Sequence, residues 1–144
     1  MAGGDRSVKS HFIYVCTTCA SVWQDGKRQG VSGGEKLLAQ LTGDAARFEV
    51  TQSYQIRPVA CMSACDRACV VGFAAEQKFT YLFGDLARES ENLPQVSEAI
   101  FACAELYLQS KTGNLAWQSR PPLLKSGILA KVPPLVELEQ VLAS

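Results

Sequence analysis

The order of hydrophobic and polar positions predicts a strand and then a helix in the first third of the chain. Residues 11–16 (HFIYVC) form a short apolar run rich in aromatic and β-branched types, which predicts a buried strand. The polar, glycine-rich residues 17–34 predict a loop. Ser32 and Glu35 have the spacing of a capping box, so we expect a helix to begin there and to stop near Gly43. The apolar face of that helix carries Leu37, Leu38 and Leu41.

Three further segments predict the rest of a sheet. Residues 47–61 are rich in strand-forming types, but Pro58 cannot donate to a ladder, so we expect one bent strand or two pieces. Residues 70–75 (VVGFAA) and 78–84 (KFTYLFG) flank two polar residues, a pattern that predicts a β-hairpin.

A second helix and a tail complete the predicted order. Asn92, with Pro94 in the first turn, marks a helix start, and Gly113 marks the end. The apolar positions of this helix repeat at Val96, Ile100, Cys103 and Tyr107. Residues 114–144 are rich in proline and in leucine, isoleucine and valine, so we expect a tail wrapped on the core, with a short helix from Leu135. The order β α β β β α predicts an α/β or α+β sandwich in which helices cover a mixed sheet.

Composition narrows the class of protein. The chain has 144 residues, of which 47% are hydrophobic, enough for one domain with a single core. Fourteen basic residues balance fourteen acidic ones, so no global field attracts nucleic acid or anionic lipid. The N-terminus has no apolar run of signal-peptide or membrane-span length, and we expect a cytoplasmic protein. The one histidine, His11, precedes a strand and is expected at the surface.

The cysteine spacing indicates a metal site. In a reducing compartment, clustered thiols serve as metal ligands or redox catalysts more often than as structural disulfides. Two motifs supply five thiols: C-x2-C after the first strand and C-x3-C-x3-C about forty residues later, namely Cys16, Cys19, Cys61, Cys65 and Cys69. The second spacing fits one face of a helix, but strand-like residues follow it, which favours a loop around a metal. Four thiolates suit iron, alone or in a cluster, as well as zinc. The sixth thiol, Cys103, lies on the apolar face of its helix and is expected to pack as a small hydrophobe.

These motifs resemble a known family. The stretches YVCTTC, CMSACDRACVVGF and KFTYLFGDL are similar to the DUF1636 family of predicted metal-binding proteins, which is similar in fold to thioredoxin-like [2Fe-2S] ferredoxins. The resemblance runs from about residue 12 to about residue 135. It implies one thioredoxin-like domain over residues 1–144, with a core at about 11–112 and a C-terminal tail, 113–144, packed on that core.

The resemblance also implies a ligand set. Cys16 matches the first cluster ligand of those ferredoxins, and Cys61 and Cys65 match their C-x3-C pair. Cys19 takes the place of the remaining ligand. Cys69 stands where those ferredoxins commonly carry a proline, and it is the alternative fourth ligand.

Three functions follow, and the sequence leaves them open. The first is a non-enzymatic [2Fe-2S] electron carrier that serves a redox partner protein and is linked to cobalamin biosynthesis, as the gene neighbours of the family imply. The second is a metallochaperone or storage protein that binds zinc, cobalt or iron through the same thiols and delivers the metal to a receiving enzyme. The third is a thiol-disulfide oxidoreductase that uses Cys16 and Cys19, although the next predicted helix begins more than ten residues after them. The resemblance also implies that the chain can pair as a homodimer.

Overall fold

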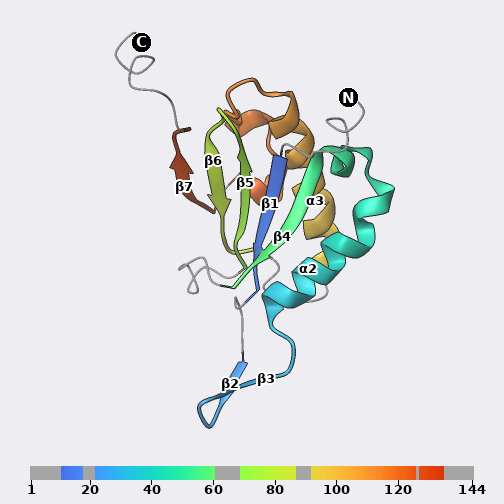
Figure 1. The fold of residues 1–144 in the computed structure, drawn as a ribbon, viewed down its shortest axis with the longest axis vertical. Helices are drawn as coiled ribbons and strands as arrows, with labels where there is room; N and C mark the ends of the chain where they lie inside the picture. The colour runs from blue at the N-terminus through green and yellow to red at the C-terminus, as the bar shows by residue number, and fades with distance from the viewer. Residues whose placement is uncertain (1–10, 18–21, 61–68, 87–91, 126, 135–144) are drawn as a thin grey trace, which may run out of the picture.

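One mixed sheet organises the molecule. The computed structural model describes residues 11–17, 22–60, 69–86, 92–125 and 127–134. The sheet has five strands in the order β4-β1-β5-β6-β7 (Figure 1). β1 runs parallel to β4, and every other neighbouring pair is antiparallel. The strands are β1 (His11–Cys16), β4 (Tyr54–Val59), β5 (Val71–Ala75), β6 (Thr80–Phe83) and β7 (Ile128–Val132).

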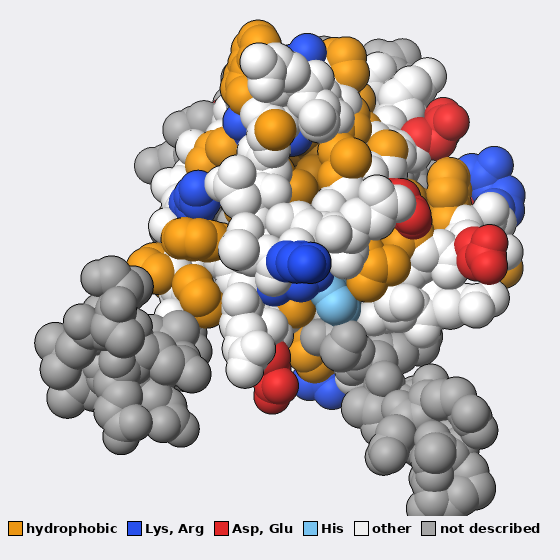
Figure 2. Space-filling model, turned by 90° about the horizontal axis from the view of Figure 1, so that it is seen from above, with side chains coloured by type: hydrophobic (Ala, Val, Ile, Leu, Met, Phe, Trp, Pro, Cys, Tyr) orange, Lys and Arg blue, Asp and Glu red, His pale blue; other side chains and the backbone are white. Residues whose placement is uncertain are grey.

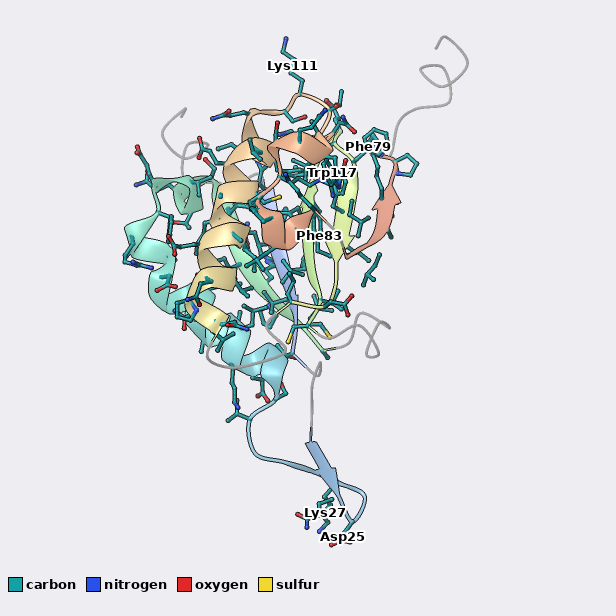
Figure 3. All side chains as sticks on the ribbon, turned by 180° about the vertical axis from the view of Figure 1, so that it is seen from behind. Asp25, Lys27, Phe79, Phe83, Lys111 and Trp117 are labelled. Carbon is teal, nitrogen blue, oxygen red and sulfur yellow. The ribbon has the colours of Figure 1, made fainter. Side chains whose placement is uncertain are left out.

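The strand order and directions confirm the predicted fold class. A parallel first pair at one side, followed by two antiparallel steps, is the sheet of a thioredoxin-like α/β domain. The two described helices are α2 (Gly33–Asp44) and α3 (Leu93–Gln109), and both lie on the same face of the sheet (Figures 1 and 3). The predicted order of β α β β β α corresponds to β1, α2, β4, β5, β6 and α3.

The core lies between this sheet face and the helices. Side chains alternate along β1: Ile13 and Val15 are fully buried toward the helices, whereas Phe12 and Tyr14 are only partly buried on the opposite face. Tyr54 at the start of β4 is also buried and donates its hydroxyl to the carbonyl of Ala104 in α3, at 2.7 Å. Burial of these apolar surfaces is the main stabilising term of the domain.

A β-hairpin occupies part of the segment that we predicted as a loop. β2 (Val22–Gln24) and β3 (Lys27–Gln29) pair with each other as a separate two-stranded sheet that projects from the body (Figures 1 and 3). Asp25 and Gly26 form its turn with φ of 56° and 78°. Asp-Gly is among the sequences best suited to a turn with two positive φ values, so this signal was in the sequence and was missed.

The strand predicted from residue 47 begins later. Two 3₁₀ helices, η1 (Ala45–Arg47) and η2 (Glu49–Ser53), come first, and β4 starts only at Tyr54. The Thr51 hydroxyl contacts the carbonyl oxygens of Ala45 and Phe48, each at 2.7 Å. Local side-chain hydrogen bonds of this kind hold a turn against the strand propensity of the residues around it.

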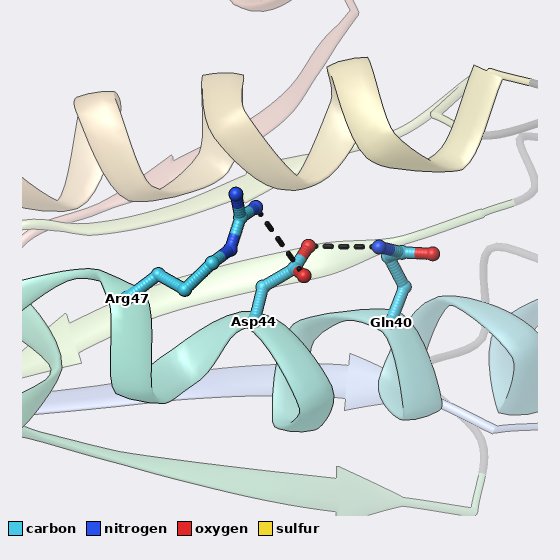
Figure 4. A network of polar contacts seen from close by, with 3 residues as sticks. All are labelled: Gln40, Asp44 and Arg47. Carbon is cyan, nitrogen blue, oxygen red and sulfur yellow. Dashed lines mark hydrogen bonds and ion pairs between the residues drawn. The ribbon is translucent and has the colours of Figure 1, made fainter.

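The end of α2 is held by polar contacts (Figure 4). Gln40 donates to the Asp44 carboxylate at 2.8 Å, and Arg47 lies 3.3 Å from the same group. These partners, with the Gln40 hydrogen bond as the largest contribution, hold the pKa of Asp44 below its usual value. An acidic residue is unfavourable at a helix C-terminus, and the neighbouring guanidinium offsets that effect.

Helix α3 follows its prediction at most positions. Asn92 precedes the first turn, as expected, but its side chain makes no capping hydrogen bond. The four predicted apolar positions, Val96, Ile100, Cys103 and Tyr107, are all buried.

A lysine from another element caps the end of α3, whose last turn has no basic residue. Lys78, between β5 and β6, donates to the carbonyls of Tyr107 and Leu108 at 2.8 and 3.1 Å. Its Nζ also lies 2.9 Å from His11 Nε2. His11 is only 8% exposed, so the expected surface position was wrong; Figure 2 shows in pale blue the part of the histidine side chain that remains accessible. Burial, and then the Lys78 charge, lower the pKa of His11.

The chain beyond α3 packs on the same face as the helices up to its return to the sheet. It forms η5 (Trp117–Ser119), η6 (Pro122–Leu124) and then β7, and Leu124 is fully buried. The helix predicted from Leu135 lies outside the described residues. Neither described helix is long and apolar enough to cross a membrane.

The first turn of α2 touches the backbone of β1. Ser32 caps the helix through its hydroxyl and Glu35, and this capping box confirms the prediction. At Gly34 there is no room for a side chain, because a Cβ would lie 1.9 Å from the carbonyl oxygen of Cys16. Glycine is therefore required here for close backbone approach rather than for an unusual φ.

Lys78→Met is expected to lower the free energy of unfolding by about 1–2 kcal/mol, because two carbonyls at the negative end of the α3 dipole lose a cationic donor. Urea unfolding followed by circular dichroism measures the change. Lys111→Met is the matched control, since Lys111 is exposed just beyond the helix (Figure 3). Equal effects of the two substitutions would contradict this assignment.

Gly34→Ala is expected to destabilise the protein by about 1–3 kcal/mol, because the new methyl group must push helix and strand apart. Gly43→Ala in the same helix is the control, since a Cβ there meets nothing within 4 Å. That control is expected to stabilise by about 0.5–1 kcal/mol through helix propensity. Thermal or urea unfolding of both variants tests whether their changes in stability have opposite signs. A Gly34→Ala variant as stable as the wild type would disprove the tight contact.

Candidate metal centre

The candidate centre begins at the carboxyl end of β1. Cys16, the last residue of the strand, is fully buried, and its amide donates to the carbonyl of Val70 at 3.1 Å. The next residue, Thr17, donates from its amide and its hydroxyl to the carbonyl of Val59, at 2.8 and 3.2 Å. The end of β1 is thus fixed between the end of β4 and the residue that precedes β5.

The amino end of α2 lies against the same point. The Ser32 hydroxyl donates to the carbonyl of Thr17, and Gly34 packs on Cys16 as described above. The segment that contains the β2–β3 hairpin therefore starts and ends at the same place, because Ser32 after the hairpin contacts Thr17 before it. The sequence places the start of this helix more than ten residues after the first cysteine motif, but the fold brings the helix N-terminus back to the backbone of Cys16.

The structure brings Cys69 to Cys16. Cys69 exchanges two backbone hydrogen bonds with Leu86, at 2.7 and 3.2 Å, and its neighbour Val70 accepts from Cys16. The Cys69 side chain is fully buried. Burial, and then the proximity of Cys16, raise the pKa of the Cys69 thiol to about 11. Two buried thiols therefore share the interior at this end of the sheet.

The other cysteines fall into two groups. Cys19, Cys61 and Cys65 lie outside the described residues. Cys103 is buried in the middle of α3, as predicted, and burial raises the pKa of its thiol to about 12. Within the described ranges, no three histidine, cysteine, aspartate or glutamate side chains gather as a metal-ligand set.

The remaining cysteines of the two motifs are close in sequence to residues at this end of the sheet. Cys19 follows Cys16 by three residues, and Cys65 precedes Cys69 by four. Cys61 follows Val59 by two residues, and Val59 pairs with Cys16 across the β1–β4 ladder.

The donor set fits a thiophilic metal or an iron-sulfur cluster. Thiolates are the preferred ligands of such groups, and a buried pair of thiols gives two of the four that a [2Fe-2S] cluster takes. Cys69 was only an alternative ligand in the sequence analysis. One signal could have favoured Cys69 as a ligand: it lies one residue before the predicted strand at 70–75, and that strand pairs with β1.

No curated protein matches the chain. Two solved structures, both of thioredoxin-like [2Fe-2S] ferredoxins from Aquifex aeolicus, are similar at low identity. The first is 16% identical, covers 90% of this chain and 100% of its own, and has a TM-score of 0.49. The second is 17% identical, covers 65% and 87%, and has a TM-score of 0.43.

The family model of DUF1636, described as a protein of unknown function, matches residues 13–134. The match spans most of the 144 residues, and the chain therefore belongs to the DUF1636 family.

Proposed function

We propose that this protein is an electron carrier that holds a [2Fe-2S] cluster through cysteine thiolates. The observation that carries the proposal is the convergence of Cys16 and Cys69, both fully buried, at one end of the sheet. The three other cysteines of the two motifs are close to them or to Val59 in sequence. The ligands are Cys16, Cys61 and Cys65, with Cys69 as the fourth. Cys19 is the alternative fourth ligand that the sequence resemblance favours.

The chain's own residues would bind the cluster and shield it. When bound, the cluster supplies a centre that accepts and releases one electron. Burial raises the pKa of the Cys69 thiol, and ligand binding requires the thiolate, so binding there would displace a proton. The buried setting limits water access, and this, with hydrogen bonds to sulfur, is what tunes the potential of such centres.

A carrier of this kind needs a redox partner protein and no substrate pocket. The chain would act as a cytoplasmic electron donor rather than as an enzyme, and the gene neighbours of the family suggest an acceptor in cobalamin biosynthesis.

A metallochaperone or storage role is a second candidate, because the two cysteine motifs supply five thiols, one more than a closed four-ligand site needs. The fifth thiol would allow ligand exchange while zinc, cobalt or iron passes to a receiving enzyme. The identity of the bound metal distinguishes this role from electron transfer.

A thiol-disulfide oxidoreductase is favoured by one observation, the α2 N-terminus beside the backbone of Cys16, since reactive cysteines are often found near helix N-termini. The raised pKa of Cys69 opposes a nucleophilic role for that residue, so this chemistry would fall to Cys16 and Cys19. Insulin reduction that needs only those two thiols would support it over electron transfer.

Protein purified without oxygen is expected to be red-brown and to contain acid-labile sulfide equal to its iron. Cys16→Ser is expected to lose the visible absorption, because it removes a ligand at the fixed end of β1. Cys103→Ser, which changes an equally buried thiol away from the site, is the control and should keep the colour. Colourless wild-type protein with stoichiometric zinc would contradict the electron-carrier proposal and favour metal handling.

The fourth ligand is tested by comparing two further variants. Cys69→Ser is expected to lose most of the absorption and iron, whereas Cys19→Ser keeps them, because the Cys69 thiol is buried near Cys16. Iron, sulfide and visible circular dichroism measure the outcome. The reverse result would make Cys19 the ligand and leave Cys69 as a buried small side chain.

A further inference from the structure

The sheet face away from the helices carries an ordered set of apolar side chains. Cross-strand partners point to the same face of a sheet. Because Ile13 and Val15 point to the helices, their neighbours Phe12 and Tyr14 point the other way. The register then places two rows on the open face: Arg57, Tyr14, Gly72, Leu82 and Ala130, and next to it Gln55, Phe12, Ala74, Thr80 and Val132.

Along β5 these rows place small side chains between larger ones, and we call this strip of the sheet the trough. Gly72 and Ala74 are small, whereas the rings of Phe12 and Tyr14 stand on one side, 5.7 Å apart and nearly parallel. Leu82 stands on the other side. Both described helices lie behind the sheet in Figure 1, so no described helix covers this face. A row of small residues between bulky ones is the shape that accepts an apolar helix stripe.

The trough is continuous with the edge from which the chain's last segment leaves. Val132 ends β7, lies in the second row and is 48% exposed. Pro133 and Pro134 follow, and ten residues (LVELEQVLAS) remain. Within them Leu135, Leu138 and Leu142 recur at i, i+3 and i+7, and Val141 adjoins this stripe.

We propose that residues 135–144 form an amphipathic helix that packs its leucine stripe into the trough over β5. A helix of ten residues is about 15 Å long, and β5 lies two strand spacings, about 10 Å, from β7, so the segment can reach. The proposal is independent of the metal centre, which lies at the carboxyl end of β1.

The charge at the border of the trough supports residues 135–144 as the segment that binds there. Arg57 is exposed and lies over the Phe12 ring at 5.4 Å, at the β4 side of the open face. Glu137 and Glu139 would flank the leucine stripe of the helix, one on each side, and Gln140 would lie opposite it. A carboxylate would therefore face the basic border while the apolar stripe covers the aromatic pair.

Full-length Leu138→Asp tests the proposal, with Gln140→Asp as the matched control on the opposite helix face. The Leu138 variant is expected to increase binding of the dye ANS about threefold and to lower Tm by about 4 °C, because the trough becomes exposed. The control is expected to change neither. In the wild-type protein, nuclear Overhauser contacts are expected between the Leu138 methyl groups and the rings of Phe12 and Tyr14.

Two results would overturn the proposal. One is the absence of those ring contacts together with equal behaviour of the two variants. The other is ring contacts that appear between differently labelled molecules in a mixed sample, since a second copy would then cover the trough in place of the chain's own tail.

Discussion

The close contact between the first turn of α2 and the carbonyl of Cys16 is the constraint on which the candidate centre depends. Only a residue without Cβ fits at Gly34, and Ser32 at once caps the helix and donates to Thr17. The helix N-terminus therefore cannot move away without losing the hydrogen bond from Ser32 to Thr17. This contact fixes the backbone of Cys16 and Thr17, although the segment that separates them from Ser32 in sequence includes a projecting hairpin.

The same end of the sheet collects cysteines because of how the strands are connected. β1 and β4 run parallel, so their carboxyl ends meet at one edge, and each is followed within a few residues by a cysteine motif. β5 runs antiparallel to β1, so its beginning lies at that edge and brings the last cysteine of the second motif with it. One thiol ends a strand, and one stands two residues before the next strand. Two separate stretches of chain thus bring Cys16 and Cys69 to the same end of the sheet.

Local pattern was sufficient for the elements whose signal is periodic or whose cap is specific. The capping box at Ser32, the alternation of β1 and the four apolar positions of α3 were all readable because they repeat within one element. Features that depend on partners distant in sequence could not be predicted in this way. His11 is buried by two tyrosine rings and by Lys78, and none of these lies near it in sequence. The proximity of Cys69 to Cys16 depends on the pairing of β5 with β1, which spacing alone does not give.

Burial alone does not distinguish the thiols; their neighbours do. Cys69 and Cys103 are both fully buried, and burial raises the pKa of each. Beside Cys103 the Arg120 charge partly offsets that effect, so the thiol has a cation in its surroundings already. Beside Cys69 stands Cys16, which raises the pKa further. Two adjacent buried thiols ionise together only if a cation joins them, because each thiolate otherwise opposes the other. A thiophilic metal ion would remove both the desolvation cost and the repulsion at once, and only the pair at the sheet end offers it two neighbouring thiols among the described residues.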